Sequence, residues 1–209
     1  EILRDIKASD INKLEKPMTI QYVIVKFNRL RQLADSLELL GQNKKSAKLE
    51  VLRELLRENL EGGRKAIIFS EFAEMCKILY REFPEYNPVM ITGQVPNIIR
   101  QSMLDRFNNE DGCGICIMSS AGAYGLNITA ASIVVNYDLP FSLSKLEQRI
   151  GRAHRHGQKN KVQVFNLLGK GTADMAIKKI IHAKFELSNQ ILGDAPISME
   201  QIQDMLRYE

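Results

Sequence analysis

Short apolar runs alternate with amphipathic stretches from Lys65 onward, and this alternation leaves the chain few architectures. The runs lie at Lys65–Ser70, Val89–Thr92, Ile115–Ser119, Ile133–Tyr137 and Val162–Leu168. Each is short and almost uniformly apolar, which is the pattern of a strand buried on both faces of a parallel sheet. Strands separated by helices form right-handed βαβ units. The sequence therefore predicts an α/β fold, a mainly parallel sheet sandwiched by helices.

Amphipathic helices are predicted between these strands and on both sides of them. Apolar residues at spacings of three and four mark helices within Met18–Leu40, between Ser46 and Gly62, within Glu71–Phe83 and after Pro96. Thr172 can cap a long helix that ends near Gly193. Ser198 and Gln201 form the capping-box pattern of one more short helix. Helices thus flank the predicted sheet at both ends of the chain.

The length of the chain fits one full-sized domain with appended helices. Its 209 residues are 44% hydrophobic and 26% charged, ordinary values for a globular protein. We expect a linker and lead-in helix at residues 1–45, an α/β lobe at 46–170 and a C-terminal helical extension at 171–209. The start at Glu1, which is not a methionine, suggests a fragment of a larger protein.

Two features of the sequence predict an intracellular protein without a membrane partner. No run approaches the roughly 18 consecutive apolar residues that a membrane span requires, and the N-terminus lacks the regions of a signal peptide. The odd cysteine count of 3 fits a reducing compartment. Cys113 and Cys116 form a CxxC, but no second pair follows at zinc spacing, so we expect no metal site.

Basic residues gather in one segment, between Phe141 and Gly171. Seven lysines and arginines lie there against a single acid: Lys145, Arg149, Arg152, Arg155, Lys159, Lys161 and Lys170 against Glu147. The three arginines would project from one broad face of a helix, where each like-charged pair costs roughly 0.2–0.5 kcal/mol. A bound phosphate would offset this repulsion. The alternative interpretation is a solvated basic face.

Hydroxyl-bearing residues stand at the ends of three predicted strands. They are Ser70, Thr92, which is followed by Gly93, and Ser119. Ligands bind at the carboxyl ends of strands in open parallel sheets, and hydroxyls and backbone donors suit a sugar-phosphate backbone. Each hydroxyl can equally cap the helix that follows it.

A glycine-rich loop, SSAGAYGLN, follows the strand at Ile115–Ser119. Gly122 and Gly125 permit close backbone approach to a phosphate, although a tight strand-to-helix turn needs the same residues. The chain contains no Walker A sequence, so it cannot hold a triphosphate in the manner of a P-loop. Arginines without such a cradle are typical of arginine fingers, which act on a nucleotide bound by another domain.

Four segments, in this order, resemble motifs IV, IVa, V and VI of the superfamily-two helicases. They are KAIIFSEF (Lys65–Phe72), ITGQVPNIIRQSMLDRFN (Ile91–Asn108), IMSSAGAYGLNITAASIVVNYD (Ile117–Asp138) and EQRIGRAHRHGQ (Glu147–Gln158). The chain is most similar to the second RecA-like lobe of the Swi/Snf-type ATPases, and the similarity covers nearly its whole length. The resemblance implies a RecA-like sheet sandwiched by helices.

The resemblance also implies roles at the nucleotide. Arg152 and Arg155 match the family's arginine fingers, which reach across the cleft between the lobes to the triphosphate on the first lobe. Gln148 matches a glutamine that helps close this cleft. Gly125 and Asn127 match positions of motif V near the nucleotide.

Further matches imply contacts with DNA. Ser70, Thr92, Gly93 and Ser119 match positions at which this lobe grips a DNA backbone, and Arg100 matches a basic position of motif IVa that carries no defined role.

The implied whole protein is a DNA-stimulated ATPase and translocase that remodels or displaces DNA-bound protein complexes. Its partners would be an N-terminal RecA-like lobe of the same polypeptide, double-stranded DNA and a DNA-bound protein complex. ATP with Mg²⁺ would be held mainly by the first lobe, so the fragment alone is expected to be inactive. The protein would lie in the nucleus of a eukaryote, or in the cytoplasm or nucleoid of a prokaryotic or viral system.

Two alternatives remain open: a strand-separating DNA or RNA helicase of the same superfamily, and a non-catalytic nucleic-acid-binding module. A Rossmann-type enzyme is disfavoured because no G-x-G-x-x-G follows a strand.

The chain also departs from the family. Motif VI commonly reads Q-A-x-D-R-A-H-R in this family, whereas Gln148–Arg155 reads QRIGRAHR, which is closer to general helicases and to divergent bacterial-type members of the family. Arg149 therefore stands where the family has an uncharged residue, so packing or pairing within the fold is the alternative to a phosphate contact. Ser120 and Ala123 replace a basic residue and a glycine of motif V, which weakens the case for a duplex contact at Ser120.

Overall fold

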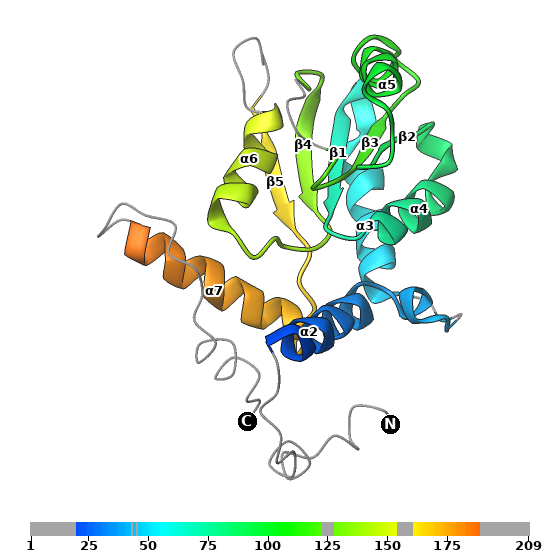
Figure 1. Ribbon diagram of the computed structural model, residues 1–209. Coiled ribbons are helices and arrows are strands. Elements are labelled where there is room, and N and C mark those ends of the chain that lie inside the picture. The colour runs from blue at the N-terminus through cyan, green and yellow to red at the C-terminus, as the bar shows by residue number, and fades with distance from the viewer. Residues whose placement is uncertain (1–19, 43, 45, 123–127, 154–160, 189–209) are drawn as a thin grey trace, which may run out of the picture.

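A five-stranded sheet forms the centre of the computed structural model, which describes residues 20–42, 44, 46–122, 128–153 and 161–188 (Figure 1). The strands are β1 (Lys65–Ser70), β2 (Val89–Ile91), β3 (Ile115–Ser119), β4 (Ala131–Asn136) and β5 (Gln163–Asn166). Their order across the sheet is β2-β3-β1-β4-β5, and all neighbouring strands run parallel. The predicted α/β fold with a parallel sheet is confirmed.

Helices cover both faces of this sheet. They are α2 (Ile20–Asp35), α3 (Ala47–Asn59), α4 (Ala73–Glu82), α5 (Asn97–Asn109), α6 (Leu143–Ala153) and α7 (Ala173–Ser188). Side chains of α3 and α4 pack on one face, and side chains of α5 and α6 pack on the other. In the described part of the chain, no helix combines the length and the apolar character that crossing a membrane requires.

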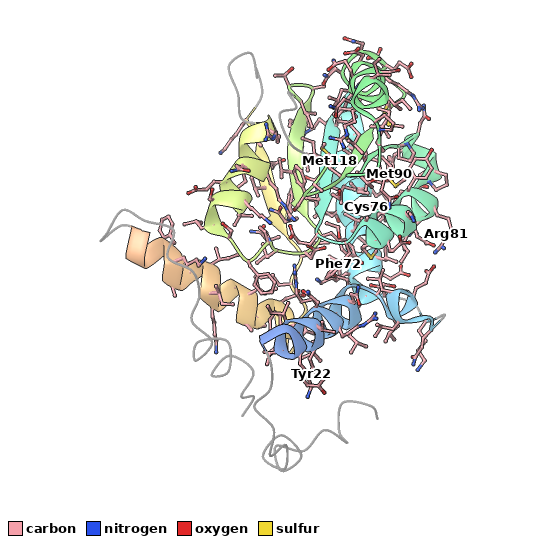
Figure 2. The ribbon with its side chains drawn as sticks, viewed as in Figure 1. Tyr22, Phe72, Cys76, Arg81, Met90 and Met118 are labelled. Atoms are coloured by element: carbon pink, nitrogen blue, oxygen red, sulfur yellow. The ribbon has the colours of Figure 1, made fainter. Side chains whose placement is uncertain are left out.

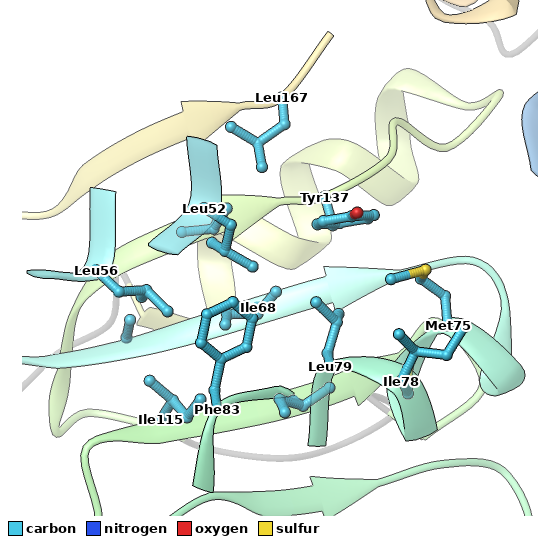
Figure 3. Close-up of a cluster of buried hydrophobic side chains, with 14 of the residues drawn as sticks. Leu52, Leu56, Ile68, Met75, Ile78, Leu79, Phe83, Ile115, Tyr137 and Leu167 are labelled. Atoms are coloured by element: carbon cyan, nitrogen blue, oxygen red, sulfur yellow. The ribbon is translucent and has the colours of Figure 1, made fainter. Parts of the chain in front are cut away.

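The central strand divides its side chains between the two faces. Ala66 and Ile68 join the cluster under α3 and α4, while Ile67 and Phe69 join the cluster under α5 and α6. This division follows from the two-residue period of a strand, in which successive side chains point to opposite faces. Figure 3 shows the first cluster, in which Ile68 lies among leucines of α3 and α4 and the ring of Phe83, which directly follows α4. All six residues of β1 are buried, as expected for the middle of a doubly covered sheet.

The first and last described helices pack together outside the sandwich. Figure 1 shows α2 and α7 lying across the end of the sheet toward which the strands point. Phe27 of α2 shares an apolar cluster with Ile177 and Ile181 of α7 and with Leu139, which follows β4. The lead-in helix and the C-terminal helix therefore meet beneath the carboxyl ends of β4 and β5. The division into three parts at residues 45 and 170 stays a prediction.

One predicted helix is divided in two. The helix expected to continue to Leu40 ends at Asp35, and a 3₁₀ turn covers Leu37–Leu40. Ser36 lies between them in an extended conformation, and its hydroxyl accepts the backbone N–H of Glu38 at 3.2 Å. Serine competes for backbone donors in this way, which favours a cap over a helix interior.

Candidate functional site

Arg149 lies on α6 with its side chain 3% exposed, at the point where three strand ends meet. Helical side chains lean toward the amino end of their helix, so Arg149 reaches back to the carboxyl ends of the strands. Its Nη1 donates to Asn136 Oδ1 at 3.1 Å and to the Asp138 carbonyl at 2.7 Å, and its Nη2 donates to Glu71 Oε1 at 2.6 Å and to Ser120 Oγ at 3.1 Å. The guanidinium therefore joins groups that follow β1, β3 and β4.

These contacts correct the phosphate interpretation for one of the three arginines. The charge of Arg149 is met by the carboxylate of Glu71 and, at 3.9 Å, by that of Asp138. Its guanidinium also lies 5.4 Å from the centre of the Phe69 ring. Because the chain's own groups surround the side chain, Arg149 packs and pairs within the fold, as the alternative to a phosphate contact predicted.

Asp138 follows β4 and closes the same cluster from the side of β1. Its Oδ2 accepts the hydroxyl of Ser70 at 2.5 Å, and its Oδ1 accepts the backbone N–H of Glu71 at 2.8 Å. Arg31 of α2 lies 3.6 Å away. Burial raises the pKa of the Asp138 carboxyl, and the neighbouring Arg149 and Arg31 oppose this shift. Sequence reasoning missed Asp138, although its position just after a strand could have drawn attention to it.

The residues predicted to grip DNA lie side by side at one edge of the sheet. Ser70 pairs with Ser119 in the register of β1 and β3, and Thr92 follows β2, the next strand along. Ser70, Thr92 and Ser119 are nevertheless buried, whereas Gly93 is exposed. A DNA contact at these four positions stays a prediction.

The two serine hydroxyls serve local turns. Besides donating to Asp138, Ser70 Oγ accepts the backbone N–H of Phe72 at 3.1 Å, just before α4. Ser119 Oγ accepts the N–H of Gly122 at 3.2 Å. Both hydroxyls therefore stabilise local turns, and for Ser70 this is not the helix cap of the alternative interpretation, since α4 begins without a side-chain cap hydrogen bond.

The first residues of the glycine-rich loop, up to Gly122, pack tightly against the end of β2. A Cβ atom placed on Gly122 would lie 2.3 Å from the carbonyl oxygen of Ile91, far inside contact distance. The close backbone approach predicted for Gly122 is thus an approach to the chain's own backbone. Arg100 holds the loop after β2, donating from Nε to the Val95 carbonyl at 2.7 Å and from Nη2 to the Gly93 carbonyl at 3.1 Å. The structure thereby gives Arg100 a role that the sequence left undefined.

Arg152 lies near the C-terminal end of α6, and Figure 1 shows this end of the helix beside the end of the sheet where β4 and β5 begin. It is partly buried, and its carbonyl accepts the backbone N–H of Ile128 at 3.3 Å. Ile128 directly follows Asn127, so this bond brings the motif V segment against the motif VI segment. Gln148 is exposed on the preceding turn of α6. Of the remaining predicted nucleotide residues, Gly125, Asn127 and Arg155 lie outside the described residues.

The three cysteines pack in the core of the protein. Cys76, Cys113 and Cys116 are all fully buried free thiols, and Figure 2 shows Cys76 on the inner side of α4, with Arg81 directed outward. Burial raises the pKa of all three thiols, that of Cys76 to about 12. Thiols kept protonated in this way are poor nucleophiles. Within the ranges that the structure describes, no group of three or more His, Cys, Asp and Glu side chains could hold a metal ion.

A second buried charge cluster lies on the α2 and α7 side of the fold. Lys48 of α3 lies 2.8 Å from Asp35 Oδ1 and donates to the carbonyl of Tyr137 at 3.1 Å. The hydroxyl of Tyr137 donates to the carbonyl of Asp35 at 2.9 Å. Burial, together with the nearby Asp138, raises the pKa of Asp35, although Lys48 opposes the shift. No local sequence pattern distinguished Lys48 from the charged residues on the exposed side of its helix.

Comparison with known proteins gives one family match and a consistent set of relatives. Residues 47–157 match the helicase conserved C-terminal domain. The chain is 28% identical, over 98% of its length, to the CHD3-type chromatin-remodeling factor CHR7 of Arabidopsis thaliana. It covers 17% of that protein. It is 33% identical, over 70% of its length, to a Caenorhabditis elegans homologue of the SWI/SNF-related matrix-associated actin-dependent regulator of chromatin subfamily A containing DEAD/H box 1. It covers 15% of that protein.

A solved structure matches the fold. The Sulfolobus solfataricus SWI2/SNF2 ATPase core in complex with dsDNA superimposes with a TM-score of 0.72 at 22% identity. The match covers 88% of this chain and 40% of the other. Because the sequence identity is only 22%, this structural similarity establishes the RecA-like fold alone.

Proposed function

Since the chain belongs to the helicase conserved C-terminal domain family and is the C-terminal lobe of a Swi/Snf-type ATPase, we propose that it forms one wall of an ATP site. The other wall would belong to an N-terminal RecA-like lobe of the same polypeptide. The whole protein would be a DNA-stimulated ATPase that moves along double-stranded DNA and remodels or displaces protein complexes bound to it. In a eukaryote it would act in the nucleus, and in a prokaryotic or viral system in the cytoplasm or nucleoid.

The hydrogen bond from Ile128 to Arg152 is the observation that carries this proposal. It holds Ile128, within the motif V segment, against Arg152, within the motif VI segment, at 3.3 Å between donor and acceptor. Residues of both motifs therefore reach the same edge of the lobe, as a shared nucleotide site requires. Gln148, exposed on the same helix, is available to a facing lobe.

In this proposal the lobe supplies positive charge, and the first lobe holds ATP with Mg²⁺. Arg152 and Arg155 would approach the γ-phosphate when the lobes close, and would stabilise the charge that develops on its oxygens. Arginine fingers contribute roughly 10³–10⁵ in rate in other phosphoryl-transfer enzymes. Gly125 and Asn127 would lie near the nucleotide, and Gln148 would help close the cleft.

The nucleic-acid face would be the edge formed by Ser70, Thr92, Gly93 and Ser119. The Sulfolobus solfataricus protein that shares this fold is described in complex with dsDNA, which supports DNA as the ligand. Because the three hydroxyl side chains are buried, we expect backbone N–H groups, with the exposed Gly93, to make the phosphate contacts at this edge.

Substitution of the arginines in the full-length protein tests the proposal. Arg152→Ala and Arg155→Ala should each abolish ATP hydrolysis while leaving the affinity for DNA largely unchanged. Arg81→Ala is the control, since Arg81 is exposed on α4 and pairs with Glu38 at the surface. If DNA binding is lost and the remaining bound enzyme hydrolyses ATP normally, the assignment of these arginines is wrong.

A strand-separating helicase is the second candidate. The QRIGRAHR form of motif VI, Gln148–Arg155, favours it because this form is closer to general helicases. An assay of the full-length protein on a duplex with a labelled strand distinguishes the two, since a translocase hydrolyses ATP without releasing that strand.

A further inference from the structure

The two terminal nitrogens of the Arg149 guanidinium have different surroundings. Its Nη1 is held by β4 and by the second residue beyond it, through Asn136 Oδ1 and the carbonyl of Asp138. Its Nη2 contacts the two loops that follow β1 and β3, through Glu71 at 2.6 Å and Ser120 at 3.1 Å. One nitrogen thus anchors α6 to the sheet, and the other contacts loops whose positions are less constrained than the strands.

Those two loop residues directly follow positions of the proposed nucleic-acid face. Glu71 comes after Ser70 and Ser120 comes after Ser119. The hydroxyl of Ser120 also bonds the carboxylate of Glu71, so the two loops and Arg149 form a closed triangle of contacts. A ligand that moves either loop must therefore strain or break a contact to Arg149.

On α6, the contacts of Arg149 lie close to Arg152, the residue proposed to approach the nucleotide. Arg149 precedes Arg152 by three residues, less than one helical turn, and a hydrogen-bonded helix transmits a displacement over that distance with little loss. The side chains of Arg149 and Glu71 are only 3% and 16% exposed, so water screens their attraction weakly. A contact of this kind resists displacement more than a surface ion pair does.

We propose that Arg149 is a positioning residue that, through Glu71 and Ser120, couples occupancy of the nucleic-acid face to the placement of Arg152. The inference rests on the proposed function, because it assigns a route by which DNA stimulates hydrolysis. Arg149 itself touches neither ATP nor DNA in this scheme. Arg149 instead affects the factor by which DNA raises the rate of ATP hydrolysis.

The test compares hydrolysis rates of the full-length protein with and without saturating duplex DNA. Glu71→Gln is the principal variant, because it keeps the size of the side chain and removes the charge that Arg149 contacts. Arg149→Lys, which keeps the charge and loses the two-nitrogen geometry, is the second. We expect both variants to lower the stimulation ratio about tenfold or more, the scale of a lost buried charge-assisted hydrogen bond. The basal rate of Glu71→Gln and its affinity for DNA should stay close to wild type.

Glu38→Gln is the matched control. It removes another glutamate–arginine contact, to Arg81 at 2.7 Å and 2.8 Å, at an exposed site where the turn at Leu37–Leu40 meets α4. Its stimulation ratio should equal that of the wild type.

The outcomes separate coupling from a merely structural role. If basal and stimulated rates of Glu71→Gln fall in proportion, or if its ratio is unchanged, the inference is overturned. If Arg149→Lys does not fold, Glu71→Gln alone decides. A wild-type protein that DNA fails to stimulate overturns the proposed function and the inference with it, whereas a stimulated wild type with equally stimulated variants overturns the inference alone.

Discussion

The Nζ atom of Lys48 lies 2.7 Å from Oδ2 of Asp174, inside the protein, and joins α3 to α7. The same ammonium lies 2.8 Å from Asp35 at the end of α2. All three side chains are at most 7% exposed. One lysine therefore connects the lobe to both of the helices that flank it in the sequence.

Lys48→Met should destabilise the chain by about 3–5 kcal/mol, because it leaves two buried carboxylates without their counter-charge. Guanidinium unfolding of the 209-residue chain measures this loss. Arg53→Met is the matched control on the same helix, since Arg53 is 42% exposed and lies 3.4 Å from Glu82 and Glu85. Its cost should stay below about 1 kcal/mol, and equal losses for the two variants would contradict the role given to Lys48.

Stability should also fall at alkaline pH because of Lys48. Burial lowers the pKa of its ammonium, but Asp35 and Asp174 outweigh burial and leave the pKa above the ordinary 10.5. The folded state therefore holds this proton more tightly than the unfolded state, so the stabilisation is complete below 10.5 and is lost as pH rises through the folded pKa. Urea unfolding between about pH 9 and 11.5 should show a shallower decline for Lys48→Met than for wild type, and parallel curves would refute the assignment.

Two glycine substitutions should have opposite effects. Gly122→Ala places a methyl group 2.3 Å from the Ile91 carbonyl oxygen, and we expect a loss of about 1–3 kcal/mol from the displacement of the loop. Gly151→Ala on α6 meets no atom within 4 Å and should stabilise the chain by about 0.5–1 kcal/mol. Thermal or chemical denaturation of both variants checks the signs, and a neutral Gly122→Ala would show that the loop can move away freely.

The 209-residue chain should not hydrolyse ATP by itself. Its sequence lacks a Walker A motif, so the γ-phosphate would have no cradle until a first lobe is present. A phosphate-release assay on the purified chain, with and without duplex DNA, tests this. Turnover that co-purifies with the folded chain and disappears in Arg152→Ala would disprove the division of the site between two lobes.

Thiol reagents should reach the cysteines only on unfolding. Cys76, Cys113 and Cys116 are fully buried, and burial raises their pKa values. Titration with a chromogenic disulfide at pH 8 should therefore show protection of all three in the native chain and full reaction in denaturant. Rapid reaction of Cys113 or Cys116 in the native chain would reopen a redox role for the CxxC.

The sequence predicts the bounds of the strands better than it predicts which strands lie side by side in the sheet. The bounds of β1 and β3 agree with the predicted Lys65–Ser70 and Ile115–Ser119, because a uniformly apolar run with polar or glycine flanks is a local signal. The order of strands across the sheet could not be predicted, since each pairing joins residues far apart in the chain. The break at Ser36 does have a local signal, because a serine within an apolar helical pattern is a cap candidate.

In the candidate site too, the sequence indicates individual residues but not their distant partners. Motif VI drew attention to Arg149 as a charge in need of a partner, but that partner, Glu71, stands 78 residues earlier in the chain. No spacing rule links the two positions. Lys48 and Asp174 are a similar case, because a buried ion pair between distant helices leaves no pattern in either helix. Such partners follow from the tertiary fold alone.

The position of β1 in the sheet bears on how the chain is made. It is the central strand, flanked by β3 and β4, yet both of these are synthesised after it. At about 5–20 residues per second, several seconds separate the emergence of Ser70 from that of Asn136. Until β3 has emerged this apolar strand has two open edges, and until β4 has emerged it keeps one, with which other nascent chains can pair. Ribosomes that pause between β1 and β4 should therefore produce aggregates or recruit chaperones, and the stretch from Ser70 to Ala131 is where translation speed matters most for this fold.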